Sequence, residues 1–131
     1  LWLDRDSEKI ELVKPQAFMN KSGLTLAYVK KKHPKLTGKD LFIIHDDLDL
    51  EVGKFKLYFG KGPKQHNGLI SIYQHFKTDQ FWHVRIGVDG RNGDRSIPAD
   101  KYVLSSFSPD ERVLVDQVIN QVIEELNQHL A

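Results

Sequence analysis

A His-Asn-Gly sequence at residues 66–68 brings together side chains that catalysis can use. It follows a loop rich in lysine and glycine, a composition that does not pack a protein core. Histidine titrates near neutral pH and can act as a base, and the amide of Asn67 can donate and accept hydrogen bonds at once. His66 has a second, structural interpretation, as a side chain whose hydrogen bonds are satisfied locally. Under either interpretation Asn67 is a candidate to hold a polar ligand.

A cluster of carboxylates follows the apolar run "LFII" of residues 41–44. The run predicts a strand buried on both faces, and in parallel or mixed sheets sites form beyond the carboxyl ends of such strands. Asp46 and Asp47 are therefore candidates to position a base, to bind Mg²⁺ together with Asp49, or to make the hydrogen bonds of a turn. His45 is expected to be a packed residue that donates to a carboxylate.

The positive charge of the sequence is concentrated in one stretch, although the net charge is only +1. No acidic residue occurs from Val52 through Thr78. A local cationic surface of this kind is expected where a protein meets a polyanion, and the alternative is a solubilising loop. The lysines of this acid-free stretch are Lys54, Lys56, Lys61, Lys64 and Lys77.

The elements that must position these residues alternate between strands and helices. A helix is predicted from Ser22 to a stop at Pro34, with Leu24, Ala27 and Tyr28 on one face. A second helix is predicted at residues 69–76. Strands are predicted at residues 10–13, 41–44, 54–59 and 82–88.

The C-terminal helix has the clearest signals in the chain. Ser108 is a good N-cap, Pro109 suits the first helical position, and Glu111 completes a capping box. The apolar residues that follow recur at helical spacing, which predicts a face packed on the core. They are Val115, Val118, Ile119, Val122 and Leu126.

The composition is that of an ordinary globular domain. A chain of 131 residues, of which 40% are apolar and 28% charged, predicts one domain with one core. Without cysteine, neither disulfides nor thiolate metal sites are expected. No apolar run approaches the roughly 20 residues that cross a bilayer, so we expect no membrane partner.

Five motifs follow one another in an order and spacing that resemble the bacterial-type peptidyl-tRNA hydrolases. They are "KPQAFMNKSG", "IIHDDLDLEVGKFKL", "HNGLISI", "VRIGV" and "YVLSSFSPDE". The resemblance covers the chain from about Lys14 to the C-terminal helix. It implies a single α/β domain with a twisted mixed sheet flanked by helices. It also implies hydrolysis of the ester between a peptide and the 3′ end of tRNA, which recycles tRNA from stalled translation.

The resemblance implies a role for each polar candidate. Asp46 matches an aspartate that accepts a hydrogen bond from the catalytic histidine and fixes its tautomer. Asn20 matches an asparagine that orients the attacking water and binds the 3′ end, and Asn67 matches a second one that holds substrate. Phe18 matches an aromatic position lining the 3′-terminal site, where the competing interpretation is ordinary core. His66 is expected to contact substrate beside Asn67.

The substrate implied is peptidyl-tRNA, bound by a monomer without metal or cofactor. The compartment expected is the cytoplasm, or else a mitochondrion or another organelle. The residues predicted to meet tRNA phosphates are Lys54, Lys56, Lys61, Lys64 and Arg85.

Family members begin with an extra strand, an Asn-Pro-Gly turn and the general-base histidine. We expect these parts upstream of Leu1, so the fold should lack its first strand and the 131-residue chain alone should have little activity. An alternative function is RNA binding without hydrolysis on the same scaffold, as in similar plant organelle splicing factors. The joint presence of Asn20, Asp46 and Asn67 favours the enzyme, because a protein that only binds RNA needs no catalytic aspartate.

Overall fold

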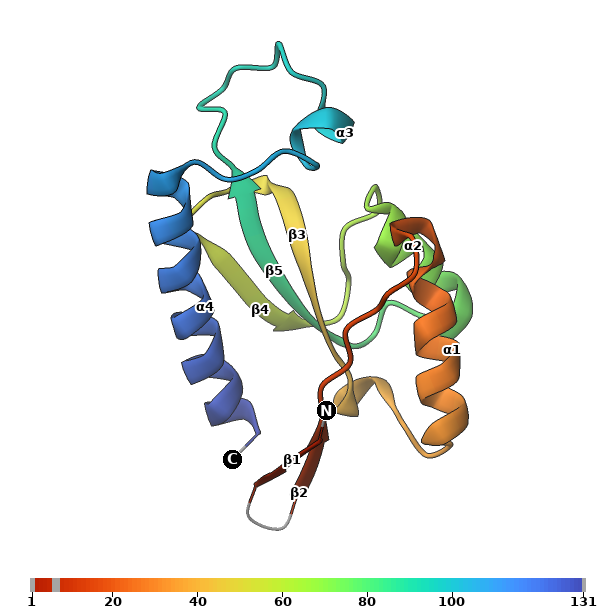
Figure 1. Cartoon of the computed structure of the whole chain (residues 1–131). Helices are drawn as coiled ribbons and strands as arrows, with labels where there is room; N and C mark the ends of the chain where they lie inside the picture. Colours follow the sequence, from red (N-terminus) through yellow and green to blue (C-terminus); the bar gives the residue numbers. More distant parts are fainter. Residues whose placement is uncertain (1, 6–7, 131) are drawn as a thin grey trace. The chain divides into compact units, whose positions relative to one another are not determined.

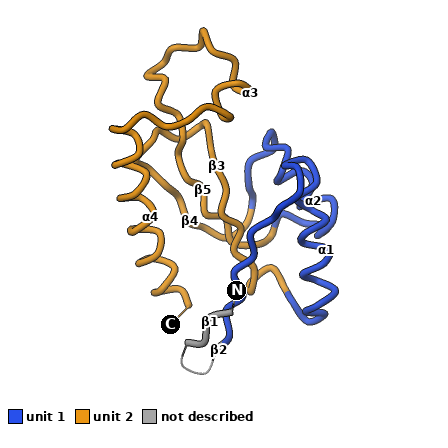
Figure 2. The backbone as a smooth tube through the Cα atoms, in the orientation of Figure 1, with its two compact units in different colours: residues 1–36, 61–79 blue, residues 37–60, 80–131 orange. Residues whose placement is uncertain are grey.

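The computed structural model describes the backbone of residues 2–5 and 8–130, with side chains from residue 9 onward. The chain divides into two compact units, coloured in Figure 2. The first takes residues 1–36 and 61–79, and the second takes residues 37–60 and 80–131. Neither unit is a continuous stretch of chain, and the prediction of one domain stays a prediction.

The first unit contains a hairpin and two packed helices (Figure 1). Strand β1 (Trp2–Arg5) pairs antiparallel with β2 (Glu8–Glu11). The 3₁₀ turn η1 (Met19–Lys21) leads into helix α1 (Ser22–Lys32), and helix α2 (Asn67–Phe76) packs against both. The pairing with β1 places β2 two residues earlier than the predicted strand at residues 10–13.

Helices α1 and α2 meet at a glycine. The Gly23 amide donates to Ser71 Oγ at 2.9 Å, and a Cβ added at Gly23 would lie only 2.2 Å from the Ser71 carbonyl oxygen. The predicted helix is confirmed, but the face that carries Leu24 and Tyr28 is exposed, at 54% and 66%. The close approach at Gly23 explains why Gly23 and Leu26 are the buried residues of α1.

The second unit is built on a three-stranded mixed sheet of order β3-β5-β4. Strand β3 (Phe42–Glu51) runs parallel to β5 (Trp82–Asp89), and β4 (Phe55–Phe59) runs antiparallel to β5. The short elements η2 (Gly38–Asp40) and α3 (Ala99–Tyr102) precede β3 and follow β5. The predicted strands at residues 54–59 and 82–88 are confirmed.

Helix α4 (Pro109–His129) covers the sheet and closes the core of the second unit (Figure 1). Its capping box is formed as predicted, with Ser108 Oγ accepting from the Glu111 amide at 3.2 Å. Val118 and Val122 pack on Val84 of β5. The predicted apolar stripe is wrong at Ile119, which is 42% exposed.

Strand β3 differs from its prediction in two ways. Ile44 is 54% exposed, so the strand is not buried on both faces. The strand also continues past the apolar run to Glu51, so Asp46 and Asp47 lie within it and not beyond its end. The α/β class with a mixed sheet is confirmed. Among the described residues, none of the helices has both the length and the apolar composition needed to cross a membrane.

Candidate functional site

His66 closes the N-terminus of α2. Its Nδ1 accepts from the Leu69 amide at 3.2 Å, and its backbone is extended, as an N-cap requires. Nδ1 is thus an acceptor, which places the proton of the neutral ring on Nε2. This geometry supports the structural interpretation of His66. Asn67, the first residue of α2, is exposed, so its amide is available to a ligand.

The turn η1 packs against the start of α2. A Cβ added at Gly68 would lie 2.5 Å from Met19 Sδ, so the absence of a side chain at Gly68 is what allows the two to meet. Asn20 is exposed on this turn, and the first unit therefore brings Asn20 and Asn67 onto touching elements. The contact between Met19 and Gly68 was not predicted, although a glycine in the first turn of a helix is a signal for close packing.

Phe18 stands at the N-terminal side of η1 with its side chain in solvent. The residue is 80% exposed, so the interpretation as ordinary core is wrong. The Lys21 amide donates to the Phe18 carbonyl at 2.8 Å, and Ser22 Oγ donates to the Met19 carbonyl at 2.7 Å. These bonds fix the turn, so Phe18 is presented by an ordered backbone.

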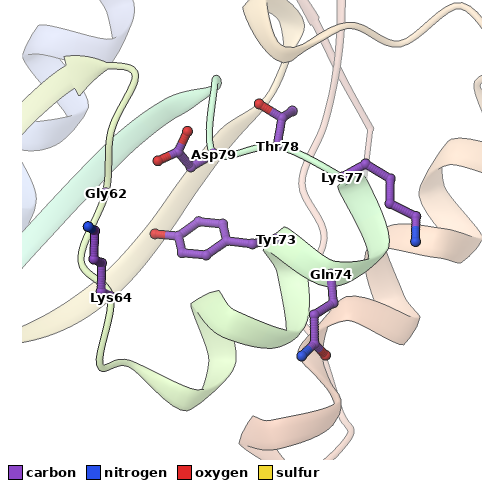
Figure 3. Close-up of a pocket in the computed structure, with 7 residues that line it drawn as sticks. All are labelled: Gly62, Lys64, Tyr73, Gln74, Lys77, Thr78 and Asp79. Atoms are coloured by element: carbon purple, nitrogen blue, oxygen red, sulfur yellow. The ribbon is translucent and has the colours of Figure 1, made fainter.

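The lysine loop, which we define as residues 61–65 before α2, is held by a hydrogen bond from α2. Tyr73 of α2 donates its hydroxyl to the Pro63 carbonyl at 2.8 Å, and Figure 3 shows that hydroxyl directed at the segment that carries Lys64. Lys61 and Lys64, on either side of Pro63, are exposed, as expected for residues that meet a polyanion. The role of Tyr73 leaves no signal in the sequence, because the contact joins residues ten positions apart through a side chain.

In the second unit, Asp46 and Asp47 point to opposite faces of β3, because successive side chains of a strand alternate. Asp47 is 6% exposed and accepts from Arg85 Nε and from the Asp49 amide. Asp46 is half-buried, and its carbonyl accepts from His45 Nδ1 at 2.9 Å. The alternation separates the carboxylates, and among the described residues no three His, Asp or Glu side chains gather as a metal site would need.

Arg85 is engaged in the second unit by two neighbours. Besides its bond to Asp47, it donates from Nη1 to the Tyr58 hydroxyl at 3.4 Å. Burial is the largest single influence on the pKa of Arg85 and lowers it, but the hydrogen bonds and charge interactions with Asp47 and Tyr58 together outweigh burial and hold the pKa above its ordinary value. The guanidinium is therefore charged and already paired with a carboxylate, which weakens its candidacy as an independent phosphate contact.

The remaining lysines of the acid-free stretch lie on or beside β4. Lys56 is exposed on the strand, in register with Arg85 of β5. Lys54 is also exposed, with its Nζ 3.7 Å from the Glu51 carboxylate. An exposed pair at that distance contributes at most about 1 kcal/mol, so Lys54 can exchange it for a phosphate.

Asp89, at the end of β5, organises the loop that follows. It accepts from Arg91 Nε at 2.8 Å and from Arg95 Nη1 at 3.1 Å. The hydrogen bond from Arg91 lowers the pKa of Asp89 to about 2. This cluster of Asp89, Arg91 and Arg95 was not predicted from the sequence.

The candidate residues thus fall into two groups, each described within its own unit. The first unit brings together an aromatic ring, two amides and exposed lysines around the start of α2, and the second holds Asp46 on a mixed sheet. An acid-free stretch whose lysines are all exposed is the pattern expected where a protein meets a polyanion.

The chain belongs to the peptidyl-tRNA hydrolase family, whose family model matches residues 3–131. It is 41% identical over 119 residues to a peptidyl-tRNA hydrolase of Geotalea uraniireducens, covering 89% of this chain and 59% of the relative. It is 41% identical over 115 residues to that of Nitrosomonas eutropha, covering 88% of this chain and 57% of the relative. The chain therefore spans less than three fifths of the length of these curated relatives.

Solved structures agree with this assignment. A peptidyl-tRNA hydrolase in complex with N-propanol superposes with a TM-score of 0.85 at 26% identity, over 98% of this chain and 63% of that one. The enzyme of Acinetobacter baumannii gives a TM-score of 0.78 at 26% identity, over 98% of this chain and 69% of that one.

Proposed function

We propose that the protein hydrolyses the ester that joins a peptide to the 3′ end of tRNA. The observation that carries the proposal is the membership of the chain in the peptidyl-tRNA hydrolase family, together with exposed Asn20 and Asn67 on touching elements. Because the chain spans only part of its relatives, the activity is proposed for the whole protein. The relatives described above are named as hydrolases, and none of them favours the non-catalytic alternative.

In the proposed reaction, water attacks the carbonyl carbon of the ester. A tetrahedral oxyanion forms, the bond from that carbon to the ribose oxygen breaks, and the ribose oxygen takes up a proton. The side chains of Asn20 and Asn67 suit the orientation of the water and the stabilisation of the oxyanion, because a neutral amide donates to an anion and accepts from water. Phe18 offers an exposed ring on which the terminal base can stack.

Asp46 is proposed to accept a hydrogen bond from the general-base histidine that the family resemblance implies. A histidine that takes a proton from water becomes cationic in the transition state, and a carboxylate next to it stabilises that charge. His66 is proposed to act beside it as a positioning residue, because its Nδ1 holds the start of α2 and thereby the backbone of Asn67.

The tRNA phosphates are proposed to meet Lys54, Lys56, Lys61 and Lys64, all of which are exposed. Arg85, in register with Lys56 on the neighbouring strand, is proposed as a further phosphate contact, weaker than the lysines because its guanidinium is already paired with Asp47. We further propose a monomer that works in the cytoplasm or in an organelle. The absence of cysteine from the sequence is consistent with a reducing compartment.

Release of peptide from purified peptidyl-tRNA tests the proposal. Asn67→Ala should reduce the rate by about 100-fold, the loss typical of one oxyanion donor. Asn120→Ala is the matched control, since Asn120 is an exposed asparagine of α4 and should keep the full rate. Failure of the wild-type protein to release peptide, or equal rates for Asn67→Ala and Asn120→Ala, would refute the proposal.

A further inference from the structure

Met19 is the single methionine of these 131 residues, and the sequence contains no cysteine that would compete with it for an oxidant. It lies in η1 directly before Asn20, and the residue is 56% exposed. Methionine usually fills gaps in a core, where the solvent does not reach it. A thioether on an exposed turn is instead open to oxidation to the sulfoxide.

The sulfur of Met19 is also a packing contact between the elements that carry Asn20 and Asn67. A Cβ added at Gly68 would lie 2.5 Å from Met19 Sδ, so the sulfur rests against the backbone of the first turn of α2. The same Cβ would lie 3.0 Å from His66 Cε1, so the ring that caps α2 borders this contact. Gly68 is buried, and the contact therefore has no room for a larger group on the sulfur.

Ser22 links the sulfur to the backbone of η1. Its Oγ donates to the Met19 carbonyl at 2.7 Å and lies 3.8 Å from Met19 Sδ. A hydroxyl has one proton to donate, and a thioether is a weak acceptor, so the carbonyl keeps the bond. A sulfoxide oxygen on the same sulfur is a much stronger acceptor. It would compete for the Ser22 hydroxyl and weaken the bond that fixes the turn.

We propose that Met19 is an oxidation site through which hydrogen peroxide reversibly inactivates the enzyme. The inference rests on the proposed function, in which Asn20 and Asn67 act together. The sulfur takes one oxygen atom from the peroxide, the O–O bond breaks, and water leaves. The thioether is thereby oxidised by two electrons and the peroxide is reduced. A methionine sulfoxide reductase reverses the step with two thiols, which become a disulfide while the oxygen leaves as water.

The sulfoxide should separate η1 from α2 because it places a bulky polar oxygen at a close apolar contact. Asn20 follows Met19 and Asn67 precedes Gly68, so this separation changes the distance between the two amides. A displacement of about 1 Å can slow catalysis by about 100-fold. The lysines proposed to meet tRNA phosphates are not part of the contact, and tRNA binding should persist.

Peptide release by the whole protein, before and after treatment with hydrogen peroxide, tests the inference. Mass spectrometry should find one added oxygen atom on the peptide that contains Met19. The treated wild type should release peptide about 10- to 100-fold more slowly. Its tRNA binding should keep the same salt slope, because no lysine has lost its charge. Methionine sulfoxide reductase with a thiol should restore the rate.

Two variants separate oxidation of Met19 from other effects of peroxide. Met19→Leu keeps an apolar side chain of similar volume and has no sulfur to oxidise, so its rates before and after treatment should be equal. Met19→Gln places a polar amide at the contact without any oxidant. It should be as slow as the treated wild type, with an unchanged salt slope.

Four results overturn the inference while the proposed function stands, provided that the untreated wild type releases peptide. The first is a Met19 that peroxide does not oxidise, and the second is an oxidised Met19 with an unchanged rate. The third is an equal loss of rate in treated Met19→Leu, which would place the responsible group elsewhere. The fourth is a parallel loss of tRNA binding, which would indicate unfolding. An untreated wild type that releases no peptide would overturn the proposed function and the inference together.

Discussion

His66 and Asn67 are neighbours in the chain, but their side chains have different roles. His66 uses Nδ1 to cap α2, while the amide of Asn67 is exposed at the same helix end. Loss of a capping side chain costs about 1 kcal/mol, so His66→Ala should lower the free energy of unfolding by that amount. His66→Ser restores a cap and should keep both stability and turnover.

Urea unfolding and peptide release measured on the same two variants check this prediction. A His66→Ser protein that is stable but as slow as Asn67→Ala would show that the His66 ring itself contacts substrate.

Asp46 and Asp49 lie on one strand and offer a matched pair of carboxylates. If Asp46 orients the general base, Asp46→Asn should lower kcat by about 10²- to 10⁴-fold with little change in KM, because the carboxylate acts mainly in the transition state. Asp49→Asn, at an exposed residue, should leave both constants unchanged. Loss of activity on chelation and its return with Mg²⁺ would indicate a metal role instead.

Asp89 should make stability depend on pH. Its pKa in the folded protein is about 2, below its ordinary value of 3.8. The carboxylate therefore stabilises the fold above about pH 4, and this contribution is lost as the pH falls through 2. At pH 5, Asp89→Asn should unfold with a lower free energy than the wild type, because the ionised carboxylate and its bonds to Arg91 and Arg95 are lost.

Urea unfolding of the wild type and of Asp89→Asn at pH 5 and pH 2 measures this effect. The gap between the two proteins should narrow at pH 2. A gap of the same size at both pH values would show that the ionised carboxylate is not its source.

At the scale of elements, the close packing of α1 against α2 depends on the absence of a side chain at Gly23. Alanine forms helices better than glycine by about 1 kcal/mol, so propensity alone predicts that Gly23→Ala stabilises the protein. The Ser71 carbonyl oxygen would lie 2.2 Å from the added Cβ, and overpacking of this kind typically costs about 1–3 kcal/mol. We therefore expect Gly23→Ala to lower the temperature of thermal unfolding. Ala27→Gly, at an exposed position of the same helix, is the control that measures the difference in helix propensity alone.

Local signals predicted the elements better than their ends and faces. The cap of α4 was predictable because Ser108, Pro109 and Glu111 act on one another within a single turn. The end of β3 was not predictable in this way, because the buried Asp47 is stabilised there by Arg85, 38 residues later. Pairing across such a distance leaves no periodic pattern in the sequence.

In the candidate site, too, some residues were predictable from the sequence and some contacts were not. The motif resemblance supplied Asn20, Asn67 and Phe18, and the structure places all three in solvent on one unit. The bond from the Tyr73 hydroxyl to the Pro63 carbonyl had no counterpart in the sequence analysis, because a side chain joins α2 to the preceding loop and no spacing rule describes such a contact.

At the scale of the whole molecule, a net charge of +1 coexists with an acid-free stretch of 27 residues, from Val52 through Thr78. A protein that is nearly neutral overall binds a polyanion through such a stretch and not through its total charge. The binding of tRNA should therefore depend strongly on salt and on only a few lysines.

Single-turnover release of peptide from peptidyl-tRNA at several salt concentrations tests the central claim most directly. The half-saturating protein concentration should rise with salt, and Lys61→Ala and Lys64→Ala should each lower the log–log slope by about 0.7 to 0.9 without changing the maximum rate. Asn67→Ala should lower the maximum rate and keep the slope, because an amide releases no counterion. Absence of peptide release at any salt concentration, or a slope that neither lysine variant changes, would contradict the proposed function.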